Sequence, residues 1–126
     1  MPKLVPSLPG ITPGPLPFSP VVEANGFVFL AGQVGDAPGK PGAVPGGIEA
    51  ETRQMLENVG TLLRAAGLDY ADVVKCTVYL RDFSEFGAMN TVYREFFPSE
   101  PPTRATVGVT ALAEDFRVEI EVLATR

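Results

Sequence analysis

The stretch from residue 117 to residue 125 constrains the fold most, because its apolar side chains occur at every second position. The alternating apolar residues are Val118, Ile120, Val122 and Ala124. Period-two spacing predicts a strand with this set on a covered sheet face, and with Glu119 and Glu121 on the opposite face. The chain must therefore supply a layer that covers one side of a sheet.

The rest of the sequence predicts alternating strands and helices. Asn25-Gly26 separates two apolar runs and favours a type I′ hairpin. A helical stripe ends at Gly67, and Ser84 and Pro98 suit the cap and the stop of a second helix. The expected elements are strands 18–23 and 27–31, a helix 48–66, a strand 72–81, a helix 84–97, and strands near 104–111 and 117–125. Crossovers through two helices predict a single α+β domain over residues 1–126, with a mixed sheet of about six strands and both helices on one face.

Two segments fall outside these elements. Residues 1–17 are rich in proline, and we expect them to lie extended over the surface or over a partner subunit. Residues 35–47 hold five glycines and three prolines. Their spacing does not match a phosphate-binding loop, because Pro41 stands where that loop needs a hydroxyl residue. A long exposed connection or a lid is the expected structure for this segment.

Composition excludes several classes of function. The 126 residues include no histidine and one cysteine, Cys76, so a thiolate zinc cluster and an internal disulfide are impossible, and we expect no metal and no cofactor. A net charge of −5 without a basic run disfavours nucleic acid. No apolar run is long enough to span a membrane, and residues 1–14 lack a signal core. The sequence therefore favours a cytoplasmic protein.

Arg104 is the first candidate site residue. Pro101 and Pro102 fix an extended approach, and Arg104 then begins a short strand. If that strand lies next to the one carrying Glu119, the two side chains can form a small polar site. On the pattern alone a second interpretation stays open, in which Arg104 is an ordinary surface arginine and the glutamates mark a solvated face.

The chain resembles the RidA family, also called the YjgF/YER057c/UK114 family. The likeness rests on Gly32-Gln33, Ala65-Ala66-Gly67-Leu68, the strand from Val74 to Leu80, Asn90-Thr91-Val92-Tyr93 before Phe96-Phe97, Pro102-Thr103-Arg104 and Val118-Glu119-Ile120-Glu121. The resemblance implies a chorismate-mutase-like fold and a trimeric barrel assembly, a homotrimer with a cleft at each subunit interface. It also implies hydrolysis of 2-imino acids, of the 2-aminoacrylate and 2-iminobutanoate type, to 2-oxo acids and ammonia.

The resemblance also implies roles for single residues. Arg104 would hold the substrate carboxylate and Glu119 would position water. The positions implied to line the substrate site are Phe18, Ala31, Gly32, Asn90, Ala105 and Thr106. A guanidinium fork matches a carboxylate bidentately. An imine is already electrophilic, so water needs only placement and proton transfer, which require neither histidine nor metal.

Several positions depart from the family pattern. Phe18 and Ala31 stand where many members carry tyrosine and serine, so two hydroxyls are missing. Thr106 replaces a common cysteine, and Thr110 replaces a small or basic residue. An alternative function is therefore a non-catalytic trimer that binds small carboxylates or carbonyl compounds. A ribonuclease or translation inhibitor fits poorly with the negative charge and the absence of histidine.

Overall fold

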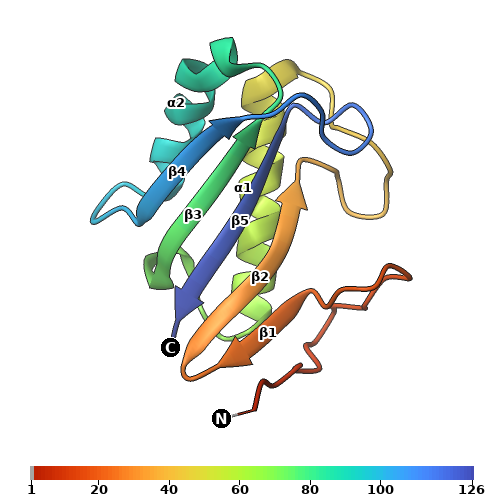
Figure 1. The fold of residues 1–126 in the computed structure, drawn as a ribbon, viewed down its shortest axis with the longest axis vertical. Helices are drawn as coiled ribbons and strands as arrows, with labels where there is room; N and C mark the ends of the chain where they lie inside the picture. The colour runs from red at the N-terminus through yellow and green to blue at the C-terminus, as the bar shows by residue number, and fades with distance from the viewer. Residues whose placement is uncertain (1) are drawn as a thin grey trace.

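The computed structural model describes residues 2–126, which form five strands and two α-helices in the order β-β-α-β-α-β-β, as predicted. The elements are β1 (Val21–Ala24), β2 (Phe27–Val34), α1 (Gly47–Ala65), β3 (Val73–Leu80), α2 (Phe86–Phe96), β4 (Thr103–Gly108) and β5 (Val118–Thr125). The strands form one mixed sheet in the order β1-β2-β5-β3-β4, with β3 and β4 parallel and the other neighbours antiparallel (Figure 1).

The sheet has five strands where the sequence predicts about six, and the proline-rich segment before β1 does not add a full strand. That segment runs beside β1 (Figure 1), and an isolated bridge joins Leu4 to Glu23 through two backbone hydrogen bonds of 2.8 and 2.9 Å. Its Leu8 and Ile11 pack against the core. Prolines remove the N–H donors that a longer ladder needs.

Both helices cover the same face of the sheet, as predicted (Figure 1). The alternation in β5 sets which residues lie beneath them. The β5 side chains buried against the helix layer are Val118, Ile120, Val122 and Ala124. Among residues 2–126 no helix covers the opposite face, which we call the open face. It carries Glu119, Glu121 and the exposed side chains of Phe29 and Val107.

The turn residues mostly act as predicted. Asn25 and Gly26 have φ values of 53° and 81°, the left-handed pair that a type I′ turn requires. Gly67 has φ 80° and ends α1 as expected. The predicted cap of the second helix is wrong. A 3-10 turn, Phe83–Glu85, precedes α2, and Asp82 caps this turn by accepting a hydrogen bond from the Ser84 N–H.

The glycine- and proline-rich segment forms the connection between β2 and α1. An isolated antiparallel bridge pairs Asp36 with Ala43 and so brings two parts of this connection together. The Asn58 side chain of α1 donates to the carbonyls of Val34 and Asp36, both at 2.9 Å, and fixes the start of the connection. No helix in residues 2–126 has the length and apolar character needed to cross a membrane.

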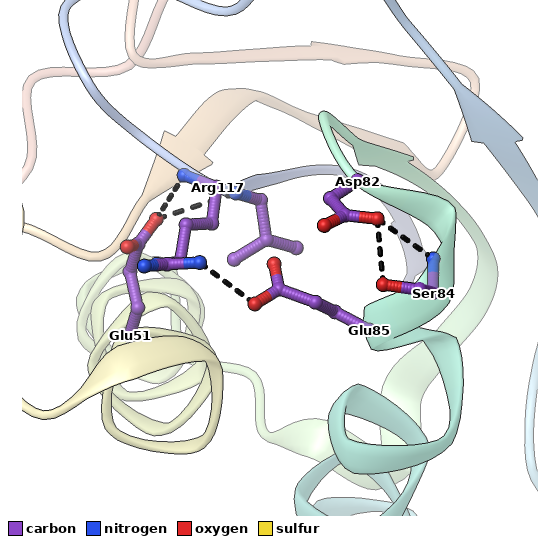
Figure 2. A network of polar contacts seen from close by, with 6 residues as sticks. Glu51, Asp82, Ser84, Glu85 and Arg117 are labelled. Carbon is purple, nitrogen blue, oxygen red and sulfur yellow. Dashed lines mark hydrogen bonds and ion pairs between the residues drawn. The ribbon is translucent and has the colours of Figure 1, made fainter.

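A polar network holds the start of β5 (Figure 2). The buried carboxylate of Glu51 on α1 accepts hydrogen bonds from the backbone N–H of Arg117 at 2.6 Å and of Val118 at 3.3 Å. The Arg117 side chain forms an ion pair of 2.7 Å with Glu85. Burial raises the pKa of Glu51, and the two backbone donors partly offset this. The network thus fixes the backbone immediately before Glu119.

We expect Glu51→Ala to lower the free energy of unfolding by about 1–3 kcal/mol, because it leaves two buried N–H donors without an acceptor. Glu51→Gln keeps an acceptor oxygen of similar shape and should retain most of that stability. Urea unfolding of both variants measures the difference. Equal destabilisation by Glu51→Ala and Glu51→Gln would show that the charge of Glu51, and not its acceptor, stabilises the start of β5.

Candidate functional site

Arg104 lies near the start of β4 with its side chain on the helix side of the sheet. It pairs in register with the buried Cys76 of β3, so the two side chains share a face. The Arg104 guanidinium carbon stands 4.6 Å from the ring centroid of Tyr93 and 5.6 Å from that of Phe86, both at α2. These distances allow cation–π attraction. Two aromatic rings of α2 therefore hold the guanidinium in place.

Arg104 borders a cavity of about 400 Å³, which we call the arginine hollow. Its lining residues are Asn90, Tyr93, Arg94, Phe97, Pro101, Pro102 and Arg104. Asn90 Oδ1 and the Tyr93 hydroxyl are buried, and neither has a hydrogen-bond partner within residues 2–126. Buried polar groups normally have partners, so unpaired ones next to a fixed cation are typical of a ligand site. Two residues named from the sequence, Arg104 and Asn90, thus come together.

The other two site residues predicted on β4, Ala105 and Thr106, lie on opposite faces of the sheet. Thr106 lies on the helix side, where it pairs with Val78, and its buried hydroxyl has no partner in the described chain. Ala105 faces the opposite way, opposite Thr77, and is exposed. Neither residue lines the arginine hollow. Their predicted contact with substrate stays a prediction.

Glu119 lies on the open face, against Gly32 of β2. A Cβ atom at position 32 would overlap Oε2 of Glu119, so glycine at this position leaves room for the Glu119 carboxylate as it lies here. Burial, and then the charge of Glu121, raises the pKa of Glu119 above its ordinary value of 4.5. No described residue pairs with Glu119 in an ion pair. The side chain is thus a partly desolvated carboxylate without a neutralising partner.

Glu119 borders a second cavity of about 490 Å³, which we call the glutamate hollow. Its lining residues are Phe18, Ser19, Val22, Phe29, Leu30, Ala31, Gly32 and Glu119. Four residues named from the sequence, Phe18, Ala31, Gly32 and Glu119, therefore meet here. Phe18 precedes β1 instead of lying within the first strand, and its ring is 60% exposed. Position 18 therefore opens on the cavity and not on packed core.

The two hollows lie on opposite faces of the sheet. The strands of Arg104 and Glu119 are not neighbours, because β3 lies between β4 and β5, so the condition for a polar site between adjacent strands is not met. The crossover through α2 returns the chain parallel to β3 at the sheet edge, and β5 then enters between β2 and β3. One copy of the chain consequently holds two separate hollows, one beside an arginine and one beside a glutamate.

Three residues near the two hollows or on the open face were not predicted from the sequence to belong to a site: Tyr93, Arg94 and Tyr79. Tyr93 enters the sequence analysis only as part of the family resemblance, yet its ring contacts Arg104. Arg94 lies one helical turn after Asn90, a spacing that could have placed it in the same hollow. On the open face the Tyr79 hydroxyl donates to Glu121 at 3.2 Å. Among residues 2–126 no group of three or more His, Cys, Asp or Glu side chains could hold a metal ion.

Known proteins resemble this chain over most of its length. The family model described as Endoribonuclease L-PSP matches residues 13–126. A 2-iminobutanoate/2-iminopropanoate deaminase of the goat, Capra hircus, is 43% identical over 110 residues, covering 87% of this chain and 80% of that protein.

Solved structures agree with this likeness. A protein of unknown function from the conserved Rid family, from Yersinia pestis, superposes with a TM-score of 0.90 at 31% identity, covering 98% of this chain and 99% of that one. TdcF from E. coli, crystallised with bound serine, gives a TM-score of 0.83 at 35% identity, covering 90% and 91%. The mixed sheet with two helices on one face is therefore the fold of these proteins.

Proposed function

The chain belongs to the Endoribonuclease L-PSP family, also called the RidA or YjgF/YER057c/UK114 family, and from this we propose that it hydrolyses small reactive 2-imino acids to 2-oxo acids and ammonia. The observation that carries the proposal is the pair of hollows. One presents a fixed cation with unpaired polar atoms, and the other presents a partly desolvated carboxylate.

Arg104 binds the carboxylate of the substrate. Its guanidinium is always charged and offers parallel N–H donors that match a carboxylate. The rings of Tyr93 and Phe86 restrict its motion, so less freedom is lost when the ligand binds. The relative TdcF was crystallised with serine, a small amino acid with the same carboxylate group. This agrees with a site for small α-carboxylates.

Glu119 acts on water. Water adds to the C2 atom of the imine, and Glu119 takes a proton from it as the carbon–oxygen bond forms. That proton passes to the nitrogen and gives a carbinolamine. The proton of its hydroxyl is then transferred to the nitrogen as the carbon–nitrogen bond breaks, so ammonia leaves and the 2-oxo acid remains. A carboxylate whose pKa lies above its ordinary value is a better base for this transfer than a fully solvated one.

The complete site forms between two copies in a homotrimer. Arg104 and Glu119 lie on opposite faces of one copy, so the arginine hollow of one subunit must meet the glutamate hollow of its neighbour. The open face supports this assembly, because Phe29 and Val107 expose 45% and 40% of their surface there. Exposed apolar side chains on an uncovered sheet commonly mark an interface.

A coupled assay tests the activity. An amino-acid oxidase generates 2-iminobutanoate in the cuvette, catalase removes the peroxide, and loss of the imine is followed with and without this protein. The proposal expects faster loss that scales with protein concentration. A rate equal to that without protein, from a preparation that light scattering shows to be trimeric, would contradict it.

The alternative, a trimer that binds such acids without turnover, is favoured by one observation. Phe18 and Ala31 bring no hydroxyl group to the glutamate hollow, so Glu119 is the sole side chain there, apart from Ser19, that can bind water. Calorimetry with 2-oxobutanoate separates the two functions. Binding without any loss of imine in the coupled assay would support the alternative.

The pH dependence gives a further prediction. Because Glu119 acts as a base, kcat/KM should fall as the pH falls through its raised pKa. Glu121→Gln removes the charge that helps to raise this pKa, so the acid limb should move to lower pH. Glu57→Gln, an exposed carboxylate on α1, is the matched control and should leave the limb in place. If the acid limb of the kcat/KM profile stays in place or moves to higher pH in Glu121→Gln, Glu119 is excluded as the base.

A further inference from the structure

The arginine hollow contains a second cation that the proposed reaction does not use. Arg94 lines it together with Arg104, and no acidic residue of the described chain does so. Neither arginine forms an ion pair within residues 2–126. The whole chain carries a net charge of −5, so the two arginines make this cavity locally positive in a protein that is negative overall. A local excess of positive charge attracts anions.

The surroundings of Arg94 do not neutralise it. Its sequence neighbour Glu95 could do so, but Glu95 pairs with Arg53 of α1 at 2.9 Å. Arg94 lies in the last turn of α2, where a cation also complements the helix C-terminus. That role does not account for the cavity it shares with Arg104. Two like charges in one hollow repel each other, and a bound anion relieves the repulsion.

We propose that the arginine hollow recognises 2-imino acids with a second carboxylate, with Arg104 on the α-carboxylate and Arg94 on the distal one. This inference rests on the proposed function and names its substrate class. Asn90 lies on α2 one helical turn before Arg94 and lines the same hollow, and its buried Oδ1 has no hydrogen-bond partner within residues 2–126. That oxygen can accept the N–H of the imine, which would sit between the two carboxylates.

The chemistry of such a substrate is consistent with the rest of the site. A dicarboxylic 2-imino acid forms when an acidic amino acid is oxidised at its Cα–N bond, so an amino-acid oxidation must supply it. Water then replaces the imine nitrogen, and the products are a 2-oxo dicarboxylic acid and ammonia. No further reactant is needed. The distal carboxylate takes no part in the reaction and serves for recognition.

Calorimetry with two stable 2-oxo acids tests the inference. 2-Oxobutanoate carries one carboxylate, whereas 2-oxoglutarate carries two. We expect the protein to bind 2-oxoglutarate at least about tenfold more tightly, as one added charge-assisted pair provides. Arg94→Gln should remove this preference, because the affinity for 2-oxoglutarate should fall much more than the affinity for 2-oxobutanoate. Arg81→Gln, an exposed arginine after β3 that forms no ion pair within residues 2–126, is the matched control and should keep the preference.

Each outcome decides between the two proposals. Equal affinity for both acids, in a protein that consumes 2-iminobutanoate, would overturn the recognition of a second carboxylate by Arg94 but would not contradict the deaminase proposal. Binding of neither acid, with no loss of imine, would overturn both. If Arg94→Gln lowers the melting temperature but keeps the preference for 2-oxoglutarate, Arg94 serves the helix end and the inference is wrong.

Discussion

Glu119→Gln is expected to lower kcat by about 10²-fold or more, while the affinity for 2-oxobutanoate changes little. Glutamine keeps the size and one acceptor oxygen of the side chain, so the close contact with Gly32 is preserved. It cannot take a proton from water. Because Arg104 and not Glu119 holds the carboxylate in the proposed site, product binding should survive. Steady-state kinetics in the coupled assay and calorimetry with 2-oxobutanoate measure the two quantities.

Glu121→Gln is the matched control for this experiment. Glu121 lies on the same strand and the same face, two residues further on, and its carboxylate accepts from the Tyr79 hydroxyl. Its loss should change the pH profile but leave kcat at its plateau. Equal kcat in Glu119→Gln and the parent protein would exclude Glu119 from catalysis. If the parent protein itself binds 2-oxobutanoate but consumes no imine, the chain is a binding protein.

The fold follows from local signals that agree with one another. The two-residue period of β5 predicts its buried set correctly, and Asn25-Gly26 predicts the hairpin turn. The helical stripe before Gly67 predicts α1 to within one residue at each end. These signals are local because backbone geometry fixes each period within a few residues. The predicted start of α2 was less accurate, since Asp82 and Ser84 are competing cap residues only two positions apart.

The geometry of the site was harder to predict. Periodicity says which residues of one strand share a face, but it does not give the order of strands in a sheet. The sequence could not show that β5 enters between β2 and β3, or that β4 pairs in parallel with β3. The strand order separates Arg104 from Glu119 by β3, and the register, in which Arg104 pairs with the buried Cys76, places Arg104 on the face opposite to Glu119. Tyr93 was missed for a related reason, because a buried aromatic residue in a stripe gives no sign of which side chain it supports.

Arg104→Ala should lower kcat/KM by about 30-fold or more, as the loss of a charge-assisted pair implies. The fold should survive, because Arg104 is half-buried at a sheet edge and forms no ion pair within residues 2–126. Binding of 2-oxobutanoate should weaken in parallel. Arg81→Ala, an exposed arginine after β3, is the control and should retain full activity. Unchanged kinetics in a folded Arg104→Ala trimer would refute the assignment.

Combining the two inactive variants gives the sharpest test of a site shared between copies. Arg104→Ala and Glu119→Gln subunits, co-expressed with different tags and purified through both, form mixed trimers. If each site takes Arg104 from one subunit and Glu119 from its neighbour, about one site in three in every mixed trimer is intact, so about a third of the parent activity should return. If one subunit supplied both residues, no site would be intact and activity would stay at the level of the single variants. The separation of Arg104 and Glu119 onto opposite faces predicts recovery.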